Sequence, residues 1–143
     1  MFIGEYQHLI DEKKRLSLPA KFRKELGKKV IITRGFDGCL VVYTEEKWKA
    51  AMEELKKLST AKAENRKFNR TILGGATEVF LDKLGRILIP DYLKKYAGLK
   101  KNVTICGLYN KLEIWDSEKW ETYRKKAEQD IDKVAENLPE LEI

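Results

Sequence analysis

A nine-residue stretch that occurs twice decides the fold: residues 11–19 read DEKKRLSLP, and residues 82–90 read DKLGRILIP. The two stretches are 71 positions apart. Further residues repeat at this offset or, after one inserted residue, at 72: Gly4 with Gly75, Gly27 with Gly98, Gly35 with Gly107, and residues 46–48 with 118–120. Self-similarity of this kind indicates two copies of one structural unit in the chain of 143 residues.

Each copy is expected to be rich in short strands. Runs of Ile, Val and Leu predict four strands per copy, at residues 2–10, 15–18, 30–34 and 39–43 and at residues 78–81, 86–89, 103–106 and 112–115. Proline before and glycine after a short segment predict one helix per copy, at residues 19–26 and 90–97. The fold class is therefore α+β and β-rich, with the order ββαββ in each copy. A unit of roughly 45 to 50 residues is marginal alone, so the two should complete one another's core.

Turns and longer helices follow from the same pattern. Asp37-Gly38 and Asn110-Lys111 stand where a tight hairpin turn needs positive φ. Thr44 and Asp116 are expected to cap two amphipathic helices, each burying one apolar stripe. The stripes are Trp48, Ala51, Met52, Leu55 and Leu58, and Trp120, Tyr123, Ala127, Ile131 and Val134. The predicted division is unit 1 at 1–47, a helical connector at 48–74, unit 2 at 75–119, and a C-terminal helix and tail at 120–143.

The chain is basic, with 29 lysine and arginine residues against 23 aspartate and glutamate residues, a formal net charge of +6. The excess lies in residues 1–71, which carry 17 basic and 10 acidic side chains, whereas residues 72–143 carry 12 and 13. A polyanion such as nucleic acid is therefore the first partner to consider. The first half is expected to dominate any such contact.

The sequence offers little to an enzyme or a metal site. Cys39, Cys106 and the single His8 cannot supply a four-ligand zinc site, and no phosphate-binding glycine loop or Gly-x-Ser-x-Gly elbow occurs. No run approaches ~18 apolar residues and the N-terminus does not resemble a leader, so a cytoplasmic protein is expected. We therefore expect no catalysis, no cofactor, no metal, no membrane and no small-molecule substrate.

The repeated D-x-x-x-R pattern is the best candidate for a binding site. Asp11 and Asp82 are expected to accept backbone N–H groups and so to orient their loops. Arg15 and Arg86 would then point outward, suited to phosphate or to guanine in a major groove. The neighbouring cations are Lys13 and Lys14 in the first loop and Lys83 in the second, and Lys21, Arg23 and Lys24 should add charge around Arg15. A plain Asp–Arg surface pair is the alternative for each loop.

The N-terminal MFIGEY, the two repeated stretches and LEIWD at residues 112–116 resemble the bacterial MraZ family over essentially the whole chain. The resemblance implies two AbrB-like (SpoVT-AbrB) swapped-hairpin units that form a barrel-like core about a pseudo-two-fold axis, with subunits joined into a ring. It also implies a DNA-binding transcriptional regulator of its own operon, the division and cell-wall gene cluster. Carried over to this chain, the DNA-contacting pattern falls on Asp11 to Arg15 and Asp82 to Arg86. Family loops often have glycine before the arginine, so the turn at Lys14 is expected to differ in shape.

Three functions stay open at this point. The first is a ring-forming, sequence-specific regulator that binds double-stranded DNA at repeated promoter sites and is associated with the nucleoid. The second is a non-specific nucleoid-binding or RNA-binding protein that uses the same basic loops. The third is an oligomeric scaffold that recruits an acidic protein and binds no nucleic acid.

Overall fold

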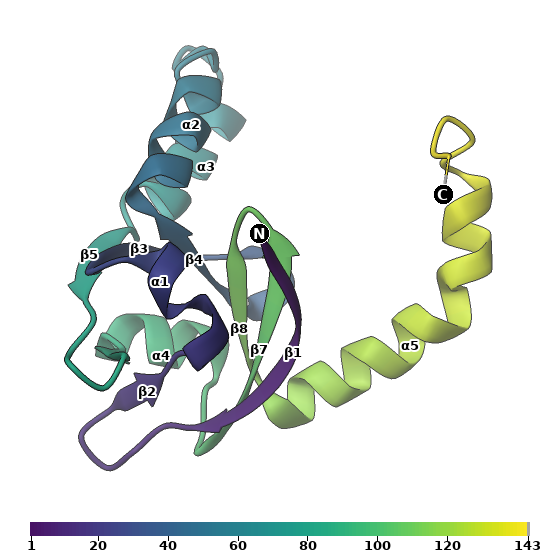
Figure 1. The fold of residues 1–143 in the computed structure, drawn as a ribbon. Coiled ribbons are helices and arrows are strands. Elements are labelled where there is room, and N and C mark those ends of the chain that lie inside the picture. The colour runs from purple at the N-terminus through teal and green to yellow at the C-terminus, as the bar shows by residue number, and fades with distance from the viewer. Residues whose placement is uncertain (143) are drawn as a thin grey trace.

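Each copy of the repeat folds as two strands, a short helix and two more strands in a computed structural model that describes residues 1–142 (Figure 1). The first copy comprises β1 (Phe2–Leu9), β2 (Arg15–Ser17), η1 (Ala20–Phe22) continuing into α1 (Arg23–Leu26), β3 (Lys29–Arg34), η2 (Phe36–Gly38) and β4 (Leu40–Thr44). The second comprises β5 (Thr77–Phe80), β6 (Arg86–Leu88), α4 (Asp91–Ala97), β7 (Asn102–Tyr109) and β8 (Leu112–Asp116). Helices α2 (Glu45–Leu55) and α3 (Ala63–Ile72) follow the first copy, and α5 (Ser117–Glu136) follows the second. The predicted α+β class and the ββαββ order are confirmed.

The two copies exchange strands. The main antiparallel sheet has the order β1-β7-β8-β4-β3-β5, so β1 of the first copy pairs with β7 of the second, and β5 of the second pairs with β3 of the first. A separate two-stranded ribbon joins β2 to β6. Interchanging the two copies leaves this order unchanged, which is the expected pseudo-two-fold arrangement. β1 and β5 remain as the two edges, so the sheet does not close into a barrel.

The β2–β6 ribbon fills the centre of the shared core. Leu16 of β2 and Ile87 of β6 are at most 1% exposed, as are Leu18 and Ile89, which directly follow these strands. They belong to one apolar cluster that draws on both copies. Phe22 closes one side of it through edge-to-face contacts with Phe2 and Tyr6 at centroid distances of 5.1 and 5.2 Å. The expectation that the copies complete one core is thus met by a ribbon to which each contributes one strand.

The two β-hairpins differ in length, so some residues that occupy equivalent places in the two copies are not those paired by the sequence offset. Arg34 pairs with Leu40 in the first hairpin, and Gly107 pairs with Leu112 in the second. Gly107 therefore occupies the place of Arg34 and not that of Gly35. The first turn has positive φ at Asp37 and Gly38, as expected, at 61° and 80°. In the second turn the residue with positive φ is Tyr109, at 65°, and the prediction of Asn110-Lys111 for that role is wrong.

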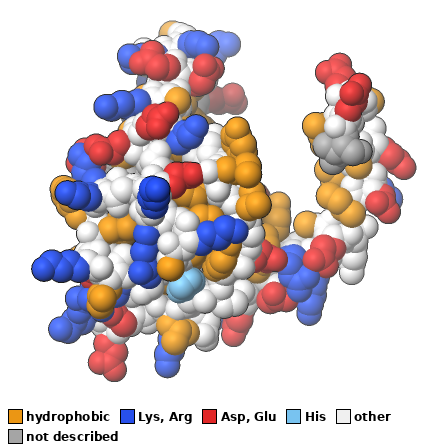
Figure 2. Space-filling view, viewed as in Figure 1, with side chains coloured by type: hydrophobic (Ala, Val, Ile, Leu, Met, Phe, Trp, Pro, Cys, Tyr) orange, Lys and Arg blue, Asp and Glu red, His pale blue; other side chains and the backbone are white. Residues whose placement is uncertain are grey.

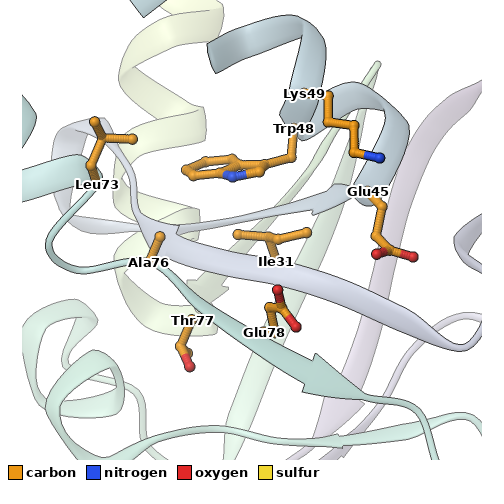
Figure 3. A pocket seen from close by; sticks show the side chains of 8 residues that line it. All are labelled: Ile31, Glu45, Trp48, Lys49, Leu73, Ala76, Thr77 and Glu78. Atoms are coloured by element: carbon orange, nitrogen blue, oxygen red, sulfur yellow. The ribbon is translucent and has the colours of Figure 1, made fainter.

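The longer helices begin where the sequence predicts. The Thr44 hydroxyl accepts a hydrogen bond from the backbone N–H of Lys47 at 3.1 Å, and the Asp116 carboxylate accepts one from Lys119 at 3.3 Å. α2 and α3 project together from one end of the sheet (Figure 1). At their base the Trp48 indole lies over Ile31 of β3, beside an open hollow of about 580 Å³ (Figure 3). Residues 59–70 contain most of α3.

The prediction that both helices bury their apolar stripes is met in part by α2, where Trp48, Ala51, Met52 and Leu55 are half-buried, and is wrong for α5. No residue of α2 or α5 is fully buried. α5 extends away from the sheet (Figure 1), and its apolar side chains are 44 to 57% exposed at Tyr123, Ile131 and Val134. Helical periodicity identifies an apolar face, but it does not say whether the surface that covers this face belongs to the same chain.

We expect Leu16→Ala to lower the free energy of unfolding by about 2 to 5 kcal/mol, because it leaves a cavity where the two copies meet. The matched control is Leu88→Ala, in the partner strand but 56% exposed, with an expected loss of about 0.5 kcal/mol or less. Urea unfolding measures both. Equal losses would contradict the central place of the ribbon in the core.

Candidate nucleic-acid interface

An aspartate organises the backbone of each repeated loop. One carboxylate oxygen of Asp11, Oδ1, accepts hydrogen bonds from the backbone N–H groups of Lys13 and Arg15, both at 2.9 Å. Oδ1 of Asp82 does the same for Leu84 at 3.0 Å and Arg86 at 2.9 Å. A short polar side chain thus closes each loop from within and fixes the position of the arginine that follows four residues later.

The two loops have the same shape although one has lysine where the other has glycine. Lys14 donates its backbone N–H to the carbonyl of Asp11 at 3.0 Å, and Gly85 donates to that of Asp82 at 3.0 Å. Both residues are left-handed, with φ of 64° and 75°. The expectation of a differently shaped turn at Lys14 is therefore wrong. The hydrogen bonds within the loop hold the lysine in this conformation at a cost of roughly 1 to 2 kcal/mol.

The arginine side chains lie against the aspartates and do not extend freely into solvent. Arg86 Nε donates to Asp82 Oδ2 at 2.7 Å, while its Nη1 lies 3.9 Å from Asp11 Oδ2. Arg15 Nε is 3.6 Å from Asp11 Oδ2 and, among residues 1–142, has no hydrogen-bond partner. The side chains of Arg15 and Arg86 are 31% and 27% exposed. Asp11 thus brings the two loops together, and both guanidinium groups are held in place while part of each stays accessible.

The loop aspartates remain ionised at neutral pH. Hydrogen bonding from the Arg15 backbone lowers the pKa of Asp11, with further lowering by the Lys13 N–H and the charges of Arg15 and Arg86. The backbone and then the side chain of Arg86 lower the pKa of Asp82 in the same way. In each loop an aspartate that is negatively charged at neutral pH therefore orients a positively charged arginine.

Strand exchange places the helix of one copy beside the loop of the other. Arg23 of α1 donates to the Leu18 carbonyl at 3.3 Å, and a Cβ atom built on Gly85 would lie only 2.1 Å from Arg23 Nε. Across the pseudo-two-fold, Lys14 forms an ion pair with Asp91 at the start of α4. The expectation that Arg23 adds its charge to the Arg15 loop is thus wrong, because Arg23 lies against the second loop.

Lysine and arginine side chains gather on the side of the molecule that carries the two loops and α1, interspersed with acidic groups (Figure 2). Lys13 and Lys83 are exposed and form no ion pair within the described part of the chain. Asp91 is a neighbour of the first loop that the sequence did not indicate, and Arg23 is a neighbour of the second loop and not of the first. The 71-residue offset alone does not predict these neighbours, because the strand exchange brings them to the loops.

The two cysteines belong to the core. Cys39 and Cys106 are buried near Trp115. Burial raises the pKa of Cys106 to about 12 and raises that of Cys39 as well, so both thiols are protonated at neutral pH. Within residues 1–142 no helix combines the length and apolar character needed to cross a bilayer.

The fold and the loops define a class of protein: a tandem repeat of strand-exchanged ββαββ units, each with an aspartate-braced arginine on the same ribbon. The family described as "MraZ protein, putative antitoxin-like" matches residues 1–71 and again residues 72–140. The chain belongs to the MraZ family.

Relatives from several bacteria match this chain over its whole length. The proteins from Natranaerobius thermophilus, Heliobacterium modesticaldum and Clostridium tetani are 44%, 46% and 46% identical over 143 residues, which is 100% of both chains in each case. Each is named transcriptional regulator MraZ. The family is thus known for regulation of transcription and is not a class of enzymes.

The lowered pKa of Asp82 makes the stability of the second loop depend on pH. A carboxylate whose folded pKa is depressed stabilises the fold above its unfolded pKa, near 3.8, and this contribution is lost as pH falls through the lower folded value. We expect Asp82→Asn to be less stable than the wild type at pH 7 and the difference to shrink at acid pH. Urea unfolding across this pH range tests it, with Asp132→Asn on α5 as the control. A difference that stays constant with pH would contradict the expected charge effect.

Proposed function

We propose that this chain is a sequence-specific DNA-binding transcriptional regulator that acts on the promoter of its own operon, the division and cell-wall gene cluster. One observation carries the proposal: two equivalent loops, each with an arginine held by an aspartate, sit on one rigid two-stranded ribbon. The names of the full-length relatives support it. Such a protein would act at the nucleoid, in the cytoplasm.

Each loop residue has a defined part in this proposal. Arg15 and Arg86 read base edges, because a guanidinium suits the two acceptors of guanine and the major groove admits a two-stranded ribbon. Lys13, Lys14 and Lys83 bind phosphates. Asp11 and Asp82 hold the loops in their binding conformation, so that less side-chain entropy is lost when DNA binds.

The exposed apolar face of α5 supports an oligomer. Tyr123, Ile131 and Val134 of α5 are exposed to water. An exposed apolar face of this kind marks a surface that contacts another apolar surface. α5 and the α2–α3 projection lie on different sides of the sheet (Figure 1), so a contact between α5 of one copy and the α2–α3 side of the next would join unlike surfaces. Head-to-tail contacts of this type close into a ring when the rotation allows it.

A competition gel shift distinguishes the three candidate functions. The probe is the DNA immediately upstream of the gene, at physiological salt, against random duplex and RNA competitors. A specific regulator keeps a large preference for its own upstream DNA. A non-specific binder responds to salt in the same way on every sequence, and a protein scaffold binds neither DNA nor RNA.

We expect Arg15→Ala and Arg86→Ala each to weaken binding to the upstream DNA by about 1 to 3 kcal/mol per subunit, because each removes one base contact. Arg70→Ala, on the exposed surface of α3, removes the same charge away from the loops and serves as the control. Fluorescence anisotropy measures the dissociation constants. The assignment of the loops fails if neither loop variant binds more weakly than the control variant.

A ring that presents identical loops at fixed spacing should bind repeated sites far better than one site. The second contact is intramolecular and can raise avidity by ~10² to 10⁴. Affinity on DNA with two sites should be highest when they are roughly 10 base pairs apart and should fall when about 5 are added, because the second site then faces away. A series with the spacer varied in single base pairs measures this, with light scattering to confirm the oligomer. Equal affinity at every spacing, no greater than for one site, would contradict multivalent binding.

A further inference from the structure

Beyond the roles of the two arginines, we propose that Asp91 restrains DNA binding at the first loop by holding the ammonium group of Lys14 as an internal counter-ion. A DNA phosphate then has to displace the Asp91 carboxylate before Lys14 can bind it. The inference rests on the proposed DNA-binding function and names a further residue that sets affinity and salt dependence at that site.

The first observation is the conformation of Lys14. Its φ of 64° lies in the left-handed region, and the equivalent residue of the second loop is glycine, which adopts that region without strain. A side chain kept in such a conformation at a binding loop indicates that the side chain has a role there. Backbone geometry alone would favour glycine at both positions.

The second observation is where the side chain goes. The Lys14 carbonyl accepts the backbone N–H of Ile89 at 2.9 Å, which brings Lys14 beside the start of α4 in the other copy. There Lys14 Nζ pairs with a carboxylate oxygen of Asp91. The pair is accessible, with side chains 45% and 76% exposed. A phosphate can therefore reach the lysine, and the carboxylate stands at the same surface.

Asp91 stays charged at this surface. The hydrogen bond from Lys14 is the main cause of its lowered pKa, and the nearby charge of Lys94 acts in the same direction. The negative charge is thus fixed at neutral pH. It cancels one cation of the loop and repels DNA phosphates that approach it.

Among residues 1–142 the second loop has no ion pair equivalent to Lys14–Asp91. It therefore serves as a comparison within the same chain. At the 71-residue offset Gly85 stands for Lys14 and Ala20 for Asp91. The nearby cation is Arg23, which makes no ion pair within residues 1–142 and lies against Gly85. The two loops thus share one backbone shape, but among residues 1–142 only the first has a turn residue whose cation pairs with a carboxylate on the helix of the other copy.

The exposure of the Lys14–Asp91 ion pair determines how strongly it restrains DNA binding. An ion pair between exposed groups is weak, so DNA can break it, and the lasting effect is the carboxylate charge beside the phosphates. Removing that charge should free Lys14 for one additional phosphate contact. Lys14 should accordingly contribute less to phosphate binding in the wild type than when Asp91 is absent.

The test is a double-mutant cycle of Asp91→Asn and Lys14→Ala, with binding to a labelled duplex of the upstream DNA followed by anisotropy. Between about 50 and 200 mM salt we expect Asp91→Asn to bind roughly 3- to 10-fold more tightly than the wild type at the low end, with a salt slope steeper by up to about one. Lys14→Ala should weaken binding of the wild type by a smaller factor than it weakens binding of Asp91→Asn, and should therefore abolish most of the gain in the double variant. Asp132→Asn changes the net charge equally on α5 and should leave affinity unchanged.

A second variant and a second measurement guard against misfolding. Asp91→Ala copies Ala20 of the other copy and should show the same gain as Asp91→Asn, with thermal melts to confirm folding. The pKa of the Asp91 carboxyl, followed by NMR, should rise towards its ordinary value in Lys14→Ala and in the DNA complex.

The inference is overturned if both Asp91 variants bind no more tightly than the wild type and Asp132→Asn, or if their gain persists fully without Lys14. Failure of the proposed function would show differently, since the wild type itself would not prefer the upstream DNA, and that result would overturn both proposals.

Discussion

The exchange of strands between the two copies is the constraint on which the rest of the structure depends. β2 and β6 each have only three residues, and neither could persist alone in water. Paired as one ribbon, they bury Leu16 and Ile87 completely and form the centre of a core that neither copy could form by itself. The loop that precedes each ribbon strand is consequently tied to both copies at once.

This constraint also explains the composition of the candidate interface. Leu18 donates its backbone N–H to the Gly85 carbonyl at 3.0 Å, and Ile89 donates to that of Lys14 at 2.9 Å, so each loop is held by the strand of the opposite copy. Each loop then meets the opposite helix, with Arg23 at one and Asp91 at the other. A tandem repeat can change these neighbours independently, so the two loops of one chain differ in charge while they keep one backbone shape.

Much of the fold and the centre of the site could be predicted from the sequence, because the signals are local. Alternating apolar residues, proline before a helix and glycine after it, and the caps at Thr44 and Asp116 depend on neighbours along the chain. The braced backbone of each loop is equally local, since the hydrogen bonds that Asp11 accepts come from the backbone of Lys13 and Arg15. The place of Arg23 depends on contacts between the two copies, and the exposure of α5 depends on tertiary packing that helical periodicity does not report. Lys14 adopts a turn conformation that residue preference assigns to glycine.

The central claim is that both loops engage DNA together on one ribbon. Hydrogen exchange measured by mass spectrometry, with and without the upstream DNA, tests it most directly. We expect residues 11–19 and 82–90 to exchange more slowly in the complex, together and at the same DNA concentration, while α2 and α3 are unchanged. Protection of only one loop, or of α2 and α3 with both loops unchanged, would contradict the claim.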